Sequence, residues 1–300
     1  MSSPQAELIA DVRNVTGESP VWHAAEKALY WADIPTGTLN RWHSRDALLS
    51  TWQAPETLAC MAVHAQGGWI AGMQSGLFHL MPQTDGSLTH TRLATVEHAL
   101  PGMRFNDGRC DRQGRFLAGT MVMDMGLSAS AGCIYSYSND SKQLRQLLDG
   151  FITPNGMAFS PDGRTMYLSD SHPSVQKIWA FDYDTSTGTP SHRRLFVDMQ
   201  PLPGRPDGAA VDVDGCYWIC GNDAGLVHRF TPQGKLDQSL SVPVKKPAMC
   251  AFGGPALDTL FVTTIRPSGI DLSDQPHAGA VFALRPGVQG MAEPVFNFSH

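Results

Sequence analysis

A pattern of short strands recurs six times along this 300-residue chain. In each copy a short segment and a turn come first, an apolar run follows as the second element, and an alternating strand follows the run as the third. The apolar runs are Leu29–Asp33, Trp69–Gly72, Phe116–Thr120, Met166–Asp170, Tyr217–Cys220 and Leu260–Thr264. The strands that follow them are Leu39–Trp42, Leu77–Leu80, Ile134–Tyr137, Ile178–Phe181, Val227–Phe230 and Val281–Leu284. A short strand precedes each apolar run, and a more polar strand follows each alternating strand. Each copy therefore has four strands, and the copies recur about every 50 residues. This period predicts an all-β chain, a six-bladed β-propeller with four antiparallel strands per blade, formed as a single domain over residues 1–300.

Two terminal segments compete to complete the last blade. Glu7–Val12 and Pro294–Phe298 both have the composition of outer strands, and pairing of either one with the last blade would close the ring. The sequence leaves both possibilities open. No long window shows helical periodicity, which favours the all-β interpretation.

Composition and charge exclude several classes of partner. The net charge is −6 and no basic run occurs, so binding to nucleic acid is not expected. No apolar stretch is long enough to span a membrane, and the first residues lack the features of a signal peptide. The six cysteines contain no CxxC pair, so we expect reduced, buried thiols. A cytoplasmic protein, as a monomer or weak homo-oligomer, is therefore predicted.

Alignment of the repeats brings oxygen-bearing side chains into one column. Each column residue lies at the start of an innermost strand, so all six should surround one mouth of the central channel. The column contains Glu18, Ala59, Asn106, Asn155, Asp207 and Ala248. Such residues often only cap turns, but turn capping gives no reason for four of them to occupy equivalent positions.

The chemistry of the column indicates a metal site. Two carboxylates and two carboxamides form a set of hard oxygen ligands without Cys or His. Such a set favours one divalent metal ion, with calcium the first choice and magnesium, manganese, iron(II) or zinc as alternatives. Three or four protein ligands leave coordination positions for water or substrate. Asp212–Gly215 also resembles the start of an EF-hand loop, but later ligands are missing and a hairpin turn is favoured.

Five motifs in order resemble the regucalcin/gluconolactonase (senescence marker protein) family. They lie between about Gly17 and Gly208, and the later blades fit the repeat. The motifs are Gly17–Trp22, Arg104–Gly108, Phe116–Met121, Pro154–Gly163 and Arg205–Gly208. The resemblance implies a propeller that opens a sugar lactone.

The same resemblance implies roles for individual residues. It assigns the metal to Glu18, Asn155 and Asp207, and contacts with the lactone to Arg104 and Asn106. Family members usually carry a Glu soon after the Ala-Gly-Thr-Met motif to bind substrate hydroxyls. Here the corresponding residue is Asp124, one methylene shorter, so the identity of the sugar stays open.

The mechanism predicted from these residues is hydrolysis of the lactone ester by water. The metal would stabilise charge that develops on oxygen, and Asp207 is the candidate catalytic base, with activation of the water by the metal as the alternative. Rival functions are a phosphotriesterase-like propeller hydrolase and a non-catalytic calcium-binding protein. The polar Arg104, Asn106 and Asp124 argue against the former, which would favour an apolar mouth. The Trp-Asp and Gly-His dipeptides typical of interaction propellers are absent from the sequence.

Overall fold

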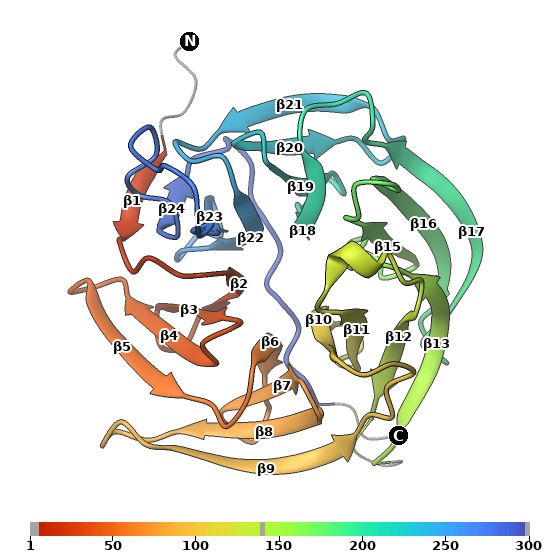
Figure 1. Cartoon of the computed structure of the whole chain (residues 1–300), viewed down its shortest axis with the longest axis horizontal. Helices are drawn as coiled ribbons and strands as arrows, with labels where there is room; N and C mark the ends of the chain where they lie inside the picture. The colour runs from red at the N-terminus through yellow and green to blue at the C-terminus, as the bar shows by residue number, and fades with distance from the viewer. Residues whose placement is uncertain (1–5, 139–141, 298–300) are drawn as a thin grey trace.

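Six four-stranded antiparallel sheets form a ring in the computed structural model, which describes residues 6–138 and 142–297 (Figure 1). The innermost strands are β2 (Gly17–His23), β6 (Leu58–Val63), β10 (Met103–Cys110), β14 (Pro154–Phe159), β18 (Arg205–Val211) and β22 (Pro247–Gly253). The second strands are β3 (Ala28–Asp33), β7 (Trp69–Met73), β11 (Phe116–Val122), β15 (Thr165–Asp170), β19 (Tyr217–Asn222) and β23 (Thr259–Thr264). The third strands are β4 (Thr38–His43), β8 (Gly76–Pro82), β12 (Gly132–Tyr137), β16 (Lys177–Asp184), β20 (Leu226–Phe230) and β24 (Val281–Leu284). The outer strands are β5 (Leu48–Gln53), β9 (Leu88–Thr95), β13 (Leu144–Phe151), β17 (Thr189–Asp198), β21 (Leu236–Ser241) and β1 (Glu7–Ala10). The predicted six-bladed β-propeller is confirmed.

The N-terminal strand closes the ring. β1 pairs antiparallel with β24 and supplies the outer strand of the sixth blade, whose other strands come from the end of the chain. Of the two segments left open by the sequence, Glu7–Val12 therefore takes this place. The competing segment contains Pro294, which has no backbone N–H for a strand ladder, and its last residue, Phe298, lies outside the described residues.

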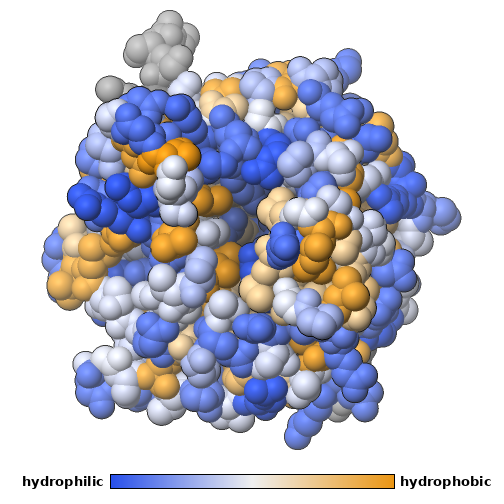
Figure 2. Space-filling view, viewed as in Figure 1, coloured by the Kyte–Doolittle hydropathy of each residue, from blue (hydrophilic) through white to orange (hydrophobic). Residues whose placement is uncertain are grey.

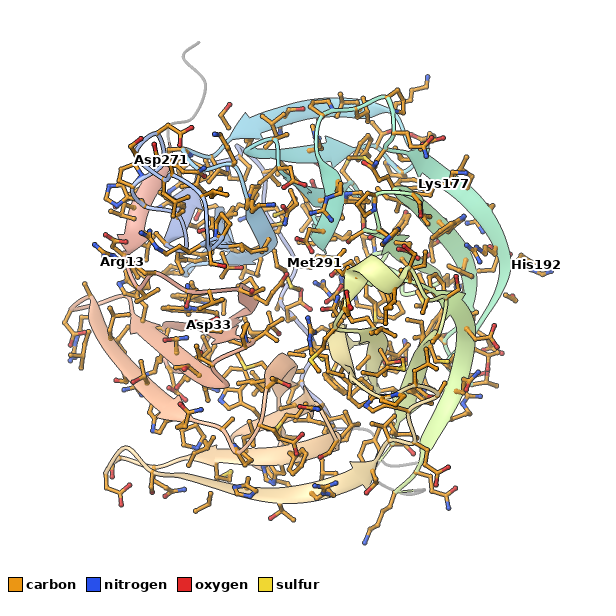
Figure 3. All side chains as sticks on the ribbon, in the orientation of Figure 1. Arg13, Asp33, Lys177, His192, Asp271 and Met291 are labelled. Carbon is orange, nitrogen blue, oxygen red and sulfur yellow. The ribbon has the colours of Figure 1, made fainter. Side chains whose placement is uncertain are left out.

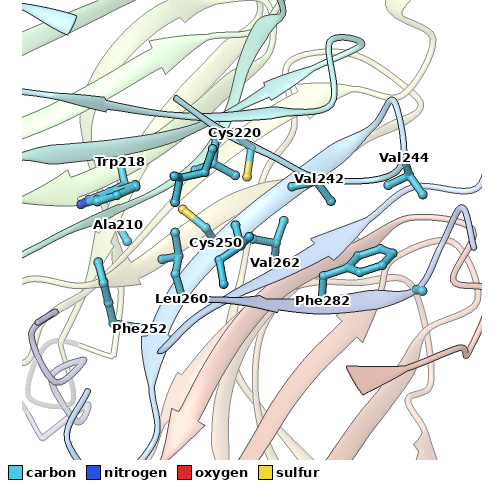
Figure 4. Close-up of a cluster of buried hydrophobic side chains, with 14 of the residues drawn as sticks. Ala210, Trp218, Cys220, Val242, Val244, Cys250, Phe252, Leu260, Val262 and Phe282 are labelled. Atoms are coloured by element: carbon cyan, nitrogen blue, oxygen red, sulfur yellow. The ribbon is translucent and has the colours of Figure 1, made fainter. Parts of the chain in front are cut away.

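The hydrophobic core lies between neighbouring blades rather than at the centre of the ring. Apolar side chains on facing sheets pack into clusters, one of which joins the fifth and sixth blades (Figure 4). There Trp218 and Cys220 of β19 meet Phe252 of β22 and Val262 of β23. The cysteines behave as predicted for small core residues, since all six are free and five are buried, while Cys133 is half-buried. Because the apolar side chains are buried between the blades, the central channel can be lined by polar groups.

The segment after β24, residues 285–297, crosses the mouth of the channel where the innermost strands end. It is the violet trace through the middle of Figure 1, and Met291, labelled in Figure 3, lies near the centre of the ring. Phe296 N–H donates to the carbonyl of Val63 at 2.8 Å, at the end of β6. Val213 N–H, just past β18, donates to the carbonyl of Gln289 at 3.0 Å. This C-terminal segment therefore covers one mouth and leaves the opposite mouth, where the innermost strands begin, for a site.

The only helical element in the described ranges is a single 3-10 turn, η1 (Met125–Leu127), between β11 and β12. It lies at the uncovered mouth, in front of the ring in Figure 1. None of the described residues belongs to a helix long and apolar enough to cross a membrane.

Candidate functional site

Every innermost strand departs from regular pairing at the aligned column. The register shifts fall between Glu18 and Val21, Leu58 and Cys60, Phe105 and Gly108, Asn155 and Ala158, Pro206 and Ala209, and Pro247 and Met249. A bulge of this kind redirects a side chain that would otherwise follow the alternation of the strand. The six shifts therefore explain how the column residues face the channel while their strands still pack in the blades.

The backbone at two of these bulges takes a left-handed conformation. Ser19, next to Glu18, has φ 51°, and Gly156, next to Asn155, has φ 59°. A Cβ on Gly156 would lie 2.5 Å from the Tyr217 hydroxyl oxygen, so this position tolerates only glycine. These turns aim Glu18 and Asn155 at the same mouth.

Asn106 is held by blade 3 and blade 4 together. Its Nδ2 donates to the carbonyl of Pro154 at 3.0 Å, and its Oδ1 accepts from Arg104 Nη1 at 2.8 Å. The same Nη1 also donates to the carbonyl of Phe105 at 2.7 Å. Burial lowers the pKa of Arg104 to about 10, against the opposing effect of Glu18, and the guanidinium still stays charged at neutral pH. Arg104 and Asn106 thus form one fixed unit of donors.

Asn155 and Asp207 are each held through one atom. Asn155 Nδ2 donates to Ser171 Oγ at 2.8 Å, and Ser171 Oγ in turn donates to the carbonyl of Pro206. Asp207 Oδ2 accepts from Asn222 Nδ2 at 2.6 Å. In the part of the chain that the structure describes, no hydrogen bond occupies Asn155 Oδ1 or Asp207 Oδ1. Each residue therefore keeps one oxygen for a ligand.

The acids at this mouth repel one another. Burial, followed by the nearby charges of Asp207 and Asp107, raises the pKa of Glu18 well above its usual range. Burial also raises the pKa of Asp207 to about 7, against the opposing hydrogen bond from Asn222. A buried set of carboxylates with raised pKa values is a place where a cation gains from neutralising charge.

The donor set fits a divalent ion that prefers oxygen. Glu18 and Asp207 supply two charges, Asn155 supplies a neutral oxygen, and Asn106 is less suited because its Oδ1 already accepts from Arg104. Across the described ranges, no group of three or more His, Cys, Asp or Glu side chains is arranged to hold a metal. A metal site here therefore depends on the carboxamide of Asn155.

Asp124 stands apart from the other predicted residues. Its Oδ1 accepts from Gly126 N–H at 3.0 Å and caps η1, and the side chain is exposed. No hydrogen bond joins it to Arg104 or Asn106 in the described residues. The segment that contains η1 lies beside the mouth, where Figure 2 shows a hydrophobic patch. Its apolar side chains Met123 and Leu127 are exposed. The substrate role of Asp124 stays a prediction.

Two further residues contribute that the column did not single out. Asp107 is buried beside the candidate ligands, where its Oδ2 accepts from Met157 N–H at 2.8 Å, while Oδ1 has no partner among the described residues. Asn222 holds Asp207 from the end of β19. Blades 1, 4 and 5 all end their second strand in Asp or Asn (Asp33, Asp170 and Asn222), a repeat signal that extension of the alignment to the second strands would have found.

The Asp212–Gly215 turn is structural, as the sequence favoured. Asp212 Oδ1 accepts from the backbone N–H groups of Asp214 and Cys216, and Oδ2 accepts from Trp218 Nε1 at 2.9 Å. Arg229 pairs with the same carboxylate at 2.7 Å. The carboxylate is saturated, and no EF-hand loop forms.

Comparisons with known proteins agree with this architecture. The family model described as "SMP-30/Gluconolactonase/LRE-like region" matches residues 16–266. A 6-deoxy-6-sulfogluconolactonase of Pseudomonas putida is 41% identical, over 94% of this chain and 95% of the relative. A regucalcin of Danio rerio is 33% identical, over 97% of this chain and 98% of the relative. The crystal structure of a calcium-binding protein, regucalcin, from Agrobacterium tumefaciens superimposes with a TM-score of 0.89 at 27% identity, over 99% of this chain and 98% of that one.

The family match and the relatives together define an enzyme of the lactonase class, a group of carboxylic ester hydrolases. The chain belongs to the SMP-30/gluconolactonase/LRE-like family, and the resemblance seen in the sequence motifs is confirmed.

Proposed function

We propose that the protein hydrolyses a sugar lactone to the corresponding aldonic acid at the mouth formed by β2, β10, β14 and β18, using one divalent metal ion. The proposal rests on two side-chain oxygens, Asn155 Oδ1 and Asp207 Oδ1, which have no hydrogen-bond partner among the described residues. Both residues lie at the same mouth as the buried Glu18. Such a site takes a hard cation, and we propose calcium, because the Agrobacterium tumefaciens regucalcin that superimposes on this chain is described as a calcium-binding protein. When bound there, the ion supplies Lewis-acid polarisation of the lactone carbonyl.

The residues of the chain position the substrate. A 2.8 Å hydrogen bond joins Arg104 to Asn106, and Asn106 also donates to the backbone of blade 4. The remaining N–H groups of the two side chains therefore have fixed positions at the mouth. Hydroxyl oxygens of a sugar are suitable acceptors for these donors. We propose that Asp124 contributes from the η1 segment. Fixed donors of this kind hold the ester close to the attacking water, which lowers the entropic part of the barrier.

Asp207 is the proposed proton acceptor. Burial raises the pKa of Asp207 to about 7 in the metal-free protein, and a bound cation keeps this carboxylate ionised at neutral pH, so that it is available to take a proton. Water adds to the carbonyl carbon as Asp207 takes its proton. The C–O bond of the ring then breaks, and the same proton passes to the departing ring oxygen, which leaves as a hydroxyl group. One water is consumed and one carboxylic acid is formed.

The test is acid release from a panel of aldonolactones in a pH-stat. Metal-stripped protein would be assayed alone and with calcium, magnesium, manganese, iron(II) or zinc restored. We expect metal-dependent turnover that is lost in Asp207→Ala and strongly reduced in Asn106→Ala, while the surface variant Asp162→Asn retains it. Metal binding without turnover of any lactone would overturn the proposal, and turnover of a phosphotriester instead would assign the mouth to that reaction.

A further inference from the structure

A second aligned column lies two residues before the first and surrounds the same mouth. Its members are Thr16, Thr57, Arg104, Thr153, Arg205 and Lys246. Three blades thus place a threonine there and three place a cation. The cations are not spread evenly, because Arg205 and Lys246 belong to the neighbouring fifth and sixth blades, while Arg104 belongs to the third.

Arg205 and Lys246 share one carboxylate. Arg205 Nε donates to Asp223 Oδ2 at 2.6 Å, and Lys246 Nζ pairs with Asp223 Oδ1. Two cations and one anion leave this cluster with a net positive charge. Asp223 is held in place at the β19–β20 turn in a left-handed conformation, with φ 78°. Burial favours its neutral form, but the hydrogen bonds from Lys246 and Arg205 outweigh burial and lower its pKa, so the carboxylate stays ionised.

The cluster is joined to the proposed catalytic residues. Asn222 donates to Asp207 at 2.6 Å and accepts from Lys246 Nζ at 3.5 Å, so it lies between the base and the cation. Arg205 Nη1 donates to the carbonyl of Ser171, whose hydroxyl accepts from Asn155. Both cations are about three-quarters buried, and no hydrogen bond uses Arg205 Nη2 within the described residues. A desolvated cation with unused donors binds an anion more strongly than a solvated surface lysine does.

We propose that Arg205 and Lys246 form an anion subsite that selects lactones with a negatively charged group on the carbon farthest from the carbonyl. This inference rests on the proposed lactone hydrolysis and names its substrate class. Blade 6 lies across the ring from blade 3 and blade 5 adjoins blade 6, so in this proposal a sugar bound by Arg104 and Asn106 extends its far end across the mouth to the cluster (Figure 1). A sulfonate, phosphate or carboxylate at that end accepts from both cations, and the 41% identical relative is named for a sulfonated lactone.

The experiment compares kcat/KM for glucono-1,5-lactone with kcat/KM for the same lactone carrying a sulfonate, a phosphate or a carboxylate at its terminal carbon. The wild type should prefer the charged lactones by at least about tenfold, and the preference should shrink as salt rises. In Arg205→Gln/Lys246→Gln the ratio of charged to neutral kcat/KM should fall by about 10- to 100-fold. The three charged lactones rank the anion that fits best.

Lys245→Gln is the matched control. Lys245 precedes Lys246 in the chain but forms an exposed pair with Asp274 at 2.5 Å, so its loss should leave the ratio unchanged. Equal turnover of charged and neutral lactones by the wild type, or an unchanged ratio in the double variant, would overturn the subsite. If the wild type hydrolyses no lactone at all, the proposed reaction fails, and calorimetry with a sulfonated aldonic acid and the same aldonic acid without the sulfonate decides the subsite alone. Tighter binding of the sulfonated acid that the double variant loses would support it, and equal binding would refute it.

Discussion

Arg109 and Glu293, which are 184 residues apart in the chain, form an ion pair of 3.2 Å between the innermost strand of blade 3 and the C-terminal segment. Arg109 Nη2 also donates to the carbonyl of Ala209 in blade 5 at 2.6 Å. One buried guanidinium therefore connects two blades to the segment that covers the far mouth. The acidic candidate site lies at the mouth where the innermost strands begin, and the Arg109–Glu293 pair lies toward the mouth that the C-terminal segment covers. One end of the channel therefore holds the proposed site, and the other end has a structural role.

Removal of the Glu293 charge should destabilise the fold more than removal of a surface charge. Glu293→Ala leaves Arg109 buried without its ion-pair partner, and we expect a loss of roughly 2 kcal/mol in the free energy of unfolding. Urea unfolding followed by tryptophan fluorescence measures it. Asp182→Ala, which breaks the exposed pairs with His192 and Arg194, is the control and should change stability little. Equal losses in the two variants would mean that the Arg109–Glu293 pair stabilises the fold no more than an exposed ion pair does.

His64 should make the protein less stable in acid. It stacks on His79 with ring centroids 4.1 Å apart and contacts Phe296, and burial, followed by the charge of His79, lowers the pKa of His64 to about 4. The unfolded chain takes up a proton below its ordinary pKa of about 6.5, whereas the native state resists until about pH 4. The stabilisation from neutral His64 is thus complete above pH 6.5 and lost as pH falls toward 4.

Melting temperatures at pH 7.5 and pH 5 measure this effect. His64→Phe keeps an aromatic ring in the stack and should reduce the drop between the two values. His192→Phe, at an exposed site, should leave the drop as it is in the wild type. A drop that is identical in all three proteins would assign the acid sensitivity to other groups.

The blades were predictable because their signal is repeated. Each copy of the Leu29–Asp33 type is a short apolar run, and six weak signals at one period reinforce one another. The convergence of Glu18, Asn106, Asn155 and Asp207 followed from the same symmetry. The bulges that redirect these side chains are local backbone events, and the alignment placed the residues without revealing the bulges.

Other features depend on contacts that no repeat encodes. Asn222 donates to Asp207 because the β19–β20 turn lies beside the mouth. Asp124 uses Oδ1 to accept a hydrogen bond that caps η1. Closure by β1 rather than by the C-terminal segment was equally undetermined, since both ends carry strand-like residues. In the structure β1 pairs with β24, whereas the C-terminal segment forms isolated bridges at His64 and Asp212, between residues too far apart in the chain for a sequence pattern to connect.

Asn222 should tune the basicity of Asp207. Its hydrogen bond at 2.6 Å lowers the pKa of Asp207 against burial, so Asn222→Ala should move the acidic limb of the pH–rate profile for lactone hydrolysis to higher pH. We also expect kcat to fall by about tenfold from loss of one hydrogen bond to a charged group. Asn40→Ala, a buried asparagine of blade 1, is the control and should leave the limb in place. A profile unchanged by Asn222→Ala would remove Asp207 as the group that sets it.

Calcium affinity should depend on pH through the same carboxylate. Asp207 has a pKa of about 7 without a ligand, so protons compete with the ion below neutrality, and the apparent affinity should fall by roughly tenfold per pH unit there. Calorimetry at pH 6 and pH 8 measures it. Calcium should also raise the melting temperature more at pH 8, where the buried carboxylates repel each other most. Equal affinity at the two values would contradict the assignment of Asp207 as a ligand.

Metal content and lactone turnover, measured on the same preparations, test the central claim most directly. Wild-type protein stripped of metal should hydrolyse gluconolactone no faster than buffer, and should recover turnover as it binds one calcium ion per chain. Glu18→Gln, with an unchanged circular dichroism spectrum, should bind none at the same concentration and stay inactive. Full turnover by the metal-stripped wild type, or wild-type turnover by Glu18→Gln, would contradict the account.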